Sequence, residues 1–254
     1  MDTILELKNV TRSFKNQGKE AVKAVDRVSI AVKPGEVYGI VGESGSGKST
    51  IARLITRLID TSSGEIWFEG VNITHLHGAK LRKIYEDMQM VFQNPVGSFD
   101  PRKTLGYGIG EGLKNRGIPK KEIRRRVAEL LEQCGLQPEL ADRYPGEVSG
   151  GQCQRAAIAR ALAVNPRLII LDEATSSLDV TVQQQILELL AKLQKEQNLT
   201  YIFICHNLAL VQMFCDRVAV MYNGKVVEEG LPDDVIWNPQ TEYTKNLVES
   251  CYLC

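Results

Sequence analysis

Residues 42–50 have the types and spacing needed to bind phosphate groups. They read GESGSGKST and match G-x-x-x-x-G-K-[ST] at every fixed position. Glycines let backbone N–H groups wrap the phosphates, Lys48 can reach the β- and γ-phosphates, and the Ser49 hydroxyl can ligate Mg²⁺. The apolar run VYGIV precedes this P-loop and an amphipathic run follows it, which is the expected strand–loop–helix context. The predicted nucleotide-binding residues are Gly42, Glu43, Ser44, Gly45, Ser46, Gly47, Lys48, Ser49 and Thr50.

An acidic pair follows the apolar run 168–171, which predicts a buried strand ending at Asp172. A carboxylate at the carboxyl end of such a strand faces the ligand crevice, so Asp172 can hold Mg²⁺ directly or through water. Glu173 is then placed to polarise a water for attack on the γ-phosphate. Alone, such a pair is often a helix N-cap, but the P-loop favours the catalytic interpretation.

Three further polar features can complete this chemistry. Gln93 follows the apolar run of MQMVFQNP, and His206 ends YIFICH. Residues 149–152, SGGQ, precede a helix-like run, and their glycines can bring backbone N–H groups close to an anion. No base, nucleophile or metal cluster lies within that segment, so the rest of its site must be elsewhere.

The elements that position these residues alternate between strand and helix patterns, which predicts an α/β fold with a largely parallel sheet. Residues 94–163 break the alternation and predict a helical insert. The run YNGKVVEEG predicts a hairpin turning at Asn223 and Gly224.

Composition limits the classes of function. The 254 residues hold 31 Lys plus Arg and 31 Asp plus Glu, and this zero net charge disfavours a broad nucleic-acid surface. No apolar run approaches the ~20 residues of a membrane span, and no secretion signal is predicted, so we expect a cytosolic chain. Cys251 and Cys254 form one C-x-x-C without a second pair, so we expect a solvated tail rather than a metal site. The remaining cysteines are predicted to be buried thiols.

In order along the chain, GESGSGKST, VFQNP, VSGGQ, LIILDEA, SSLD and FICHN resemble the motifs of the ATP-binding subunits of ABC transporters. The resemblance covers nearly the full length. It implies one domain, residues 1–254, with a RecA-like P-loop NTPase core (1–93 and 164–230) that carries an N-terminal antiparallel β-subdomain. An α-helical signature subdomain (94–163) is inserted, and a short tail (231–254) follows.

The resemblance also implies roles for single residues. Gln93 would contact Mg²⁺ and sense a transmembrane partner, and His206 would contact the γ-phosphate. Phe14 would stack on adenine, with Tyr38 a weaker candidate because it lies within the strand that leads to the P-loop. Asn207 stands where aspartate is usual in the family and can weaken local polar contacts.

Residues Ser149, Gly150, Gly151 and Gln152, called here the signature, would act on another chain. In this family the signature caps the ATP on the P-loop of the opposing subunit, and Asp179 also lies at that interface. The anion that the signature holds would then be a γ-phosphate supplied across a dimer.

The implied ligands are ATP and Mg²⁺. The implied partners are two transmembrane permease subunits, a second ABC ATPase subunit that is identical or homologous, and indirectly an extracellular substrate-binding protein, with no nucleic acid. We expect a peripheral protein on the cytoplasmic side of the membrane. VFQNPVGSFDPR, YPGEVSGGQCQR and NPQTEYTKNLV resemble the oligopeptide/dipeptide/nickel importer branch, second-ATPase type, although residues 241–244 read TEYT rather than His-Pro-Tyr-Thr. We expect peptide import; the alternatives are nickel or metal-chelate import and a non-transport ATPase scaffold in a soluble complex.

Overall fold

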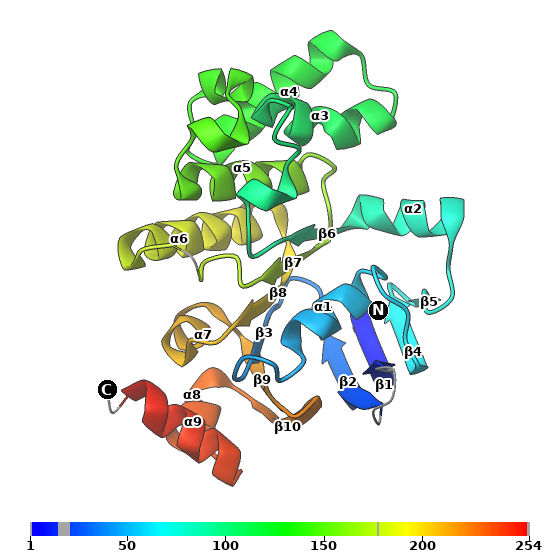
Figure 1. Ribbon diagram of the computed structural model, residues 1–254, viewed down its shortest axis with the longest axis vertical. Coiled ribbons are helices and arrows are strands. Elements are labelled where there is room, and N and C mark those ends of the chain that lie inside the picture. Colours follow the sequence, from blue (N-terminus) through cyan, green and yellow to red (C-terminus); the bar gives the residue numbers. More distant parts are fainter. Residues whose placement is uncertain (1, 15–20, 177, 253–254) are drawn as a thin grey trace. The chain divides into compact units, whose positions relative to one another are not determined.

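The computed structural model describes residues 2–14, 21–176 and 178–252 (Figure 1), with the side chains of 251 and 252 left out. Its contacts divide the chain into two compact units. The first unit combines Met1–Tyr85 with Asn198–Cys254, and the second is Glu86–Gln197. The domain boundaries expected from the sequence, including an insert at 94–163, stay a prediction.

One sheet of the first unit is antiparallel. It contains β1 (Leu5–Phe14), β2 (Val22–Val32), β4 (Ser63–Phe68) and β5 (Val71–Asn72), in the order β2-β1-β4-β5. Leu5 and Leu7 alternate with more exposed neighbours along β1, the period expected of strands with one buried face. The predicted N-terminal antiparallel sheet is therefore confirmed.

A second set of strands in the first unit carries the P-loop. Strand β3 (Val37–Val41) lies between β8 (Thr200–Cys205) and β9 (Arg217–Tyr222), and both pairings are parallel. Every residue of β3 and β8 is buried, as expected for parallel strands covered on both faces. Strand β10 (Lys225–Gly230) pairs antiparallel with β9. The turn residues Asn223 and Gly224 have φ of 46° and 77°, so the predicted hairpin is confirmed.

Helices of the first unit follow these strands. Helix α1 (Lys48–Ile55) follows β3, α7 (Leu208–Phe214) follows β8, and α8 (Pro232–Trp237) and α9 (Glu242–Tyr252) follow the hairpin. Helix α2 (Gly78–Asp87) leads into the second unit along the chain. In the described part of the chain, no helix is both long and apolar enough to span a membrane.

The second unit contains a parallel pair of strands and a group of helices. Strands β6 (Met88–Val91) and β7 (Leu168–Asp172) pair in parallel. The other elements of this unit are η1 (Val96–Ser98), α3 (Leu105–Asn115), α4 (Lys120–Gln133), η2 (Pro138–Asp142), η3 (Pro145–Glu147), α5 (Gly150–Leu162) and α6 (Val180–Gln197). The irregular and then helical run predicted from the sequence is present between β6 and β7.

Glycines of α3 allow its neighbours to approach closely. A Cβ on Gly106 would lie 2.8 Å from the carbonyl oxygen of Ala141, and one on Gly110 would lie 2.5 Å from Ile123. On the outer side of α4, hydrogen bonds from Arg125 and Arg126 lower the pKa of Glu122 to about 2. The charges of the basic residues near the start of α4 are therefore partly neutralised by Glu122 of the same helix.

Candidate nucleotide-binding and hydrolysis site

The P-loop joins β3 to α1 within the first unit. Gly47, at φ 108°, is the N-cap of α1, and it has no side chain to accept the N–H groups of the first helical turn. A helix N-terminus of this kind is suited to an anion, because its backbone donors and its dipole both favour negative charge.

Two P-loop glycines have no room for a side chain. A Cβ on Gly42, at φ 153°, would lie 2.2 Å from the carbonyl oxygen of Met221. A Cβ on Gly47 would lie 2.3 Å from the carbonyl oxygen of Ala24 in β2. The backbone itself therefore forms the cradle, held between β2 and the β9–β10 hairpin.

Two polar side chains are buried in this cradle. Lys48 is 4% exposed, and its Nζ donates to the carbonyl oxygens of Gly42 (2.7 Å) and Glu43 (2.8 Å). The Oγ of Ser46, also buried, has no hydrogen-bond partner in the described part of the chain. Because burying a hydroxyl without a partner is unfavourable, an orphaned oxygen here fits a loop built to receive a polar ligand. A triphosphate matches this set of donors.

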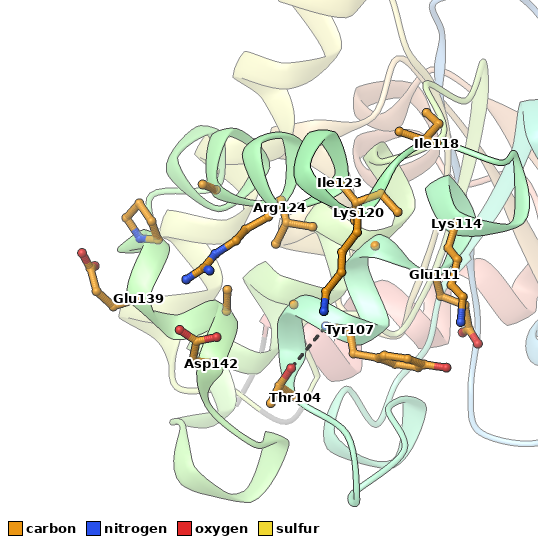
Figure 2. Close-up of a pocket in the computed structure, with 16 residues that line it drawn as sticks. Thr104, Tyr107, Glu111, Lys114, Ile118, Lys120, Ile123, Arg124, Glu139 and Asp142 are labelled. Carbon is orange, nitrogen blue, oxygen red and sulfur yellow. Dashed lines mark hydrogen bonds between the residues drawn. The ribbon is translucent and has the colours of Figure 1, made fainter.

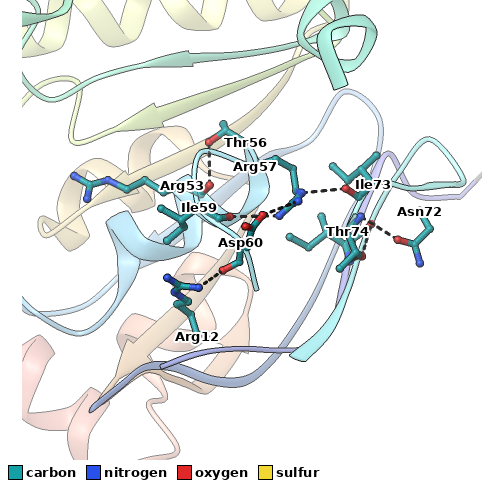
Figure 3. A network of polar contacts seen from close by, with 10 residues as sticks. Arg12, Arg53, Thr56, Arg57, Ile59, Asp60, Asn72, Ile73 and Thr74 are labelled. Carbon is teal, nitrogen blue, oxygen red and sulfur yellow. Dashed lines mark hydrogen bonds and ion pairs between the residues drawn. The ribbon is translucent and has the colours of Figure 1, made fainter. Parts of the chain in front are cut away.

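A polar network reaches the strand of Phe14, the aromatic residue expected at adenine, through Arg12 (Figure 3). Phe14 ends β1, is 40% exposed, and has the Arg12 guanidinium 4.8 Å from its ring centroid. Arg12 also donates to the carbonyl oxygen of Asp60 at 2.8 Å, and the Asp60 carboxylate pairs with buried Arg57 at 2.9 Å. This network ties the strand of Phe14 to the chain that follows α1.

Strand β2 contacts both Phe14 and the P-loop in the first unit. Phe14 pairs with Val22 of β2, and Ala24, two residues further along, contacts the P-loop at Gly47.

Tyr38, the weaker candidate for adenine stacking, is completely buried, and its hydroxyl donates to Glu229 at 2.8 Å. Burial is the main cause that raises its pKa. The weaker adenine candidate was therefore wrong, because Tyr38 has no exposed ring face.

His206 follows β8 directly and is exposed. Its neighbour Asn207 is the N-cap of α7, and its side-chain oxygen accepts from the N–H groups of Ala209 (2.9 Å) and Leu210 (3.4 Å). The residue that departs from the usual aspartate thus makes polar contacts that stabilise the start of α7.

The second unit brings Gln93 and Glu173 together. The Nε2 of Gln93 donates to Oε2 of Glu173 at 2.6 Å. Asp172, 6% exposed, ends the buried strand β7 as predicted. Glu173 has a φ of 48°, in the left-handed region that non-glycine residues rarely adopt. Nothing in the sequence pattern indicated either this contact or this backbone conformation.

The signature forms the beginning of α5. The Ser149 Oγ accepts from the N–H of Gln152 at 3.2 Å, and the Gln152 side chain accepts from the N–H of Ser149 at 2.9 Å. A Cβ on Gly151 would lie 2.8 Å from Val182 of α6, whereas one on Gly150 would make only an ordinary contact, at 3.7 Å. Asp179 caps α6 by accepting from the N–H of Val182 at 3.0 Å.

The predicted site residues therefore fall into two sets. The first unit holds Phe14, Gly42, Glu43, Ser44, Gly45, Ser46, Gly47, Lys48, Ser49, Thr50 and His206, and the second holds Gln93, Ser149, Gly150, Gly151, Gln152, Asp172, Glu173 and Asp179. Their functional roles stay predictions.

A groove of about 940 Å³ lies among α3, α4 and η2 of the second unit (Figure 2). Small and apolar residues line it, among them Gly110 and Val127. Charged side chains of both signs surround it, namely Glu111, Lys114, Lys120, Arg124, Glu139 and Asp142.

The four cysteines predicted to be buried thiols form no disulfide among the described residues. Cys134, Cys153 and Cys205 are buried as predicted, whereas Cys215 is partly exposed. Burial raises the pKa of Cys134 to about 12 and that of Cys153 to about 11, so these thiols stay protonated. The Cys251 side chain and Cys254 lie outside the described residues, and the expectation of a metal-free tail stays a prediction.

Comparison with known proteins identifies the family of this chain. Residues 25–176 match the family model described as ABC transporter. The chain belongs to the ABC transporter family. It is one of that family's ATP-binding ATPase cassettes.

Curated relatives of this cassette include glutathione import ATP-binding proteins GsiA. The protein from Salmonella paratyphi A is 49% identical over 92% of this chain, and that from Pectobacterium atrosepticum is 44% identical over 98%. The protein from Escherichia coli K12 is 46% identical over 97%. The chain spans only 38% to 41% of the length of these relatives.

Solved structures agree with the fold. A dimeric structure of the ATP-binding cassette MJ0796, in a post-hydrolysis state bound to ADP and Pi, is 34% identical with a TM-score of 0.83 and covers 90% of this chain and 98% of its own. The cassette cbiO1 from Clostridium perfringens, part of the cbiONQ transporter complex, is 31% identical with a TM-score of 0.82 and covers 100% of this chain and 97% of its own.

Proposed function

We propose that this cassette hydrolyses ATP at a dimer interface and so powers import of peptides across the cytoplasmic membrane. The observation that carries the proposal is the similarity to glutathione import proteins over 92% to 98% of the chain, since glutathione is itself a small peptide. The resemblance of VFQNPVGSFDPR and YPGEVSGGQCQR to the peptide importer branch points to the same class of cargo.

Within the first unit, the P-loop would bind the phosphates of ATP. Backbone N–H groups of the cradle would donate to them, and Lys48 would turn from the carbonyl oxygens of Gly42 and Glu43 toward the β- and γ-phosphates. Phe14 would stack on adenine with its exposed ring, while His206 would contact the γ-phosphate.

Mg²⁺ would be held by Ser49, Gln93 and Asp172, and it would neutralise phosphate charge. These are hard oxygen ligands, which suit this ion. Glu173 would act as the general base that takes a proton from the attacking water. Its hydrogen bond to Gln93 supports this role, because a base must be held in one orientation to act on a single water.

The signature would act on the ATP of a second cassette. Gly150 is exposed at the N-terminus of α5, so its backbone can approach an anion outside its own unit. ATP held between two cassettes would close the dimer, and hydrolysis would weaken it. Asp179 would contribute to the same interface.

The partners proposed are two permease subunits, a second ABC ATPase subunit, and an extracellular binding protein that acts through the permeases. The groove among α3, α4 and η2 is a suitable docking surface for a permease helix, because small residues line it and charges of both signs surround it. The cassette would then be peripheral on the cytoplasmic face.

The experiment is to tag the chain in its native host, purify it in mild detergent, and measure peptide uptake after reconstitution into vesicles. We expect two multi-span proteins to co-purify and ATP-dependent uptake of labelled glutathione or short peptides. Uptake of nickel or a metal chelate alone would replace the cargo class. Association only with soluble enzymes would contradict a transport function.

A further inference from the structure

The C-terminal helix α9 reaches the P-loop through Tyr243. The hydroxyl oxygen of Tyr243 accepts a hydrogen bond from the backbone N–H of Glu43 at 3.1 Å, although 200 residues separate the two along the chain. The Tyr243 ring also stacks on Tyr222, the last residue of β9, with 4.1 Å between ring centroids and 25° between planes. The orientation of Tyr243 is therefore set by a second aromatic ring.

The start of α9 is fixed to the β9–β10 hairpin. The Glu228 carboxylate of β10 accepts from the N–H groups of Gln240 (2.9 Å) and Thr241 (3.1 Å). The Thr241 hydroxyl in turn accepts from the N–H of Thr244, which is completely buried. These contacts leave Tyr243 little freedom to leave its position.

The same hairpin contacts the P-loop at other points. The N–H of Gly224 donates to the carbonyl oxygen of Ser46 at 2.9 Å, and the carbonyl oxygen of Met221 occupies the space beside Gly42. Hairpin and helix together hold the loop at Gly42, Glu43 and Ser46. In the described part of the chain, the hydroxyl of Tyr243 is the group of α9 that bonds to the P-loop, and a substitution in α9 can remove this bond.

We propose that Tyr243 is a positioning residue for nucleotide binding, through which α9 sets the affinity of the P-loop for ATP. It holds the peptide group between Gly42 and Glu43 at its N–H, while the carbonyl oxygen of the same peptide group, which belongs to Gly42, is one of the two that accept from Lys48. Loss of the hydroxyl frees this peptide to rotate, so ordering it again falls to the nucleotide. The inference rests on the proposed binding of ATP at the P-loop.

The test compares Tyr243→Phe, which keeps the ring stack and removes the acceptor, with Tyr222→Phe, which removes a hydroxyl from the other ring of the same stack. Dissociation constants for a fluorescent ATP analogue and steady-state hydrolysis are measured on the full chain. Tyr243→Phe should raise the dissociation constant and KM about three- to tenfold, the effect of one neutral hydrogen bond, with kcat within about twofold. Tyr222→Phe should match the parent.

Amide hydrogen exchange gives a second readout that does not depend on hydrolysis. The Glu43 N–H should exchange faster in Tyr243→Phe than in the parent and in Tyr222→Phe. Unchanged affinity and exchange in Tyr243→Phe, with normal binding by the parent, would overturn this inference alone. A parent chain that does not bind the analogue, or a Lys48→Ala chain that binds it equally well, would instead overturn the proposed function.

Discussion

The P-loop and the signature are both glycine-containing segments that begin a helix, yet they are built differently. The P-loop ends in Gly47, which offers no side-chain cap to α1. It buries both Lys48 and the Ser46 hydroxyl, which has no hydrogen-bond partner among the described residues. The signature caps its own helix, because Ser149 and Gln152 exchange hydrogen bonds. One segment is locally incomplete without a ligand, whereas the other is locally satisfied and exposed. This difference fits the proposal that the P-loop binds the nucleotide and that the signature closes over the nucleotide of another chain.

The largest effect is expected at Glu173, and it gives the reference with which variants of the P-loop and of the signature are compared. Replacing Glu173 with Gln should lower hydrolysis ~10²–10⁴-fold, the usual effect of losing a positioned base, while nucleotide binding persists. Phosphate release and nucleotide titration on the same preparation measure the two quantities. Turnover close to that of the parent would remove Glu173 from the role of base.

Lys48→Ala and Ser149→Arg should separate binding from closure. Lys48→Ala should weaken nucleotide affinity about 10- to 100-fold, because a charged hydrogen-bond donor is lost at the phosphates. Ser149→Arg should keep monomer affinity and lose turnover, because the longer side chain blocks approach to another chain's nucleotide.

Mixing the two variants sharpens this comparison. If the chain pairs with itself, a mixed dimer contains one intact site, and hydrolysis should reappear across mixing ratios. If it pairs with a relative, the signature substitution must be made in the relative. Loss of nucleotide binding by Ser149→Arg in the isolated monomer would mean that the signature acts on its own P-loop.

Replacing a glycine with alanine should affect the free energy of unfolding differently in the two segments. Gly42→Ala should lower the free energy of unfolding by about 1–3 kcal/mol, because its Cβ would meet the Met221 carbonyl oxygen at 2.2 Å. Gly150→Ala should leave it unchanged or raise it by up to about 1 kcal/mol, since the site is open and helical. Denaturant unfolding of each chain compares them, and equal losses would contradict the contrast.

The smallest expected effect concerns the cap of α5. Ser149→Ala removes the acceptor for the Gln152 N–H and should lower the free energy of unfolding by about 1 kcal/mol. Ser149→Asp is the matched control, because aspartate also caps helices and should retain most of the stability. Thermal unfolding of both variants measures the difference, and equal losses would show that capping is not the role of this side chain.

Sequence patterns predicted those features that depend on local spacing. The P-loop motif predicted the strand β3 and helix α1 around it, and the apolar run before Asp172 predicted the buried β7. Contacts between distant segments were missed, because no local pattern encodes the bond from Gln93 to Glu173 or from Glu43 to Tyr243. Tyr38 was weighed as an adenine partner because residue type alone does not reveal that it is completely buried.

The left-handed backbone at Glu173 means that directed evolution for heat resistance and selection for function would favour different residues at this position. A β-carbon in that conformation costs about 1–2 kcal/mol, so glycine at position 173 would relieve the backbone while deleting the carboxylate. A screen that scores survival at high temperature would therefore enrich inactive chains at this position, whereas a screen for growth on peptides would retain the strained glutamate. Sequencing both populations would show whether glycine replaces Glu173 in the first screen and glutamate is retained in the second.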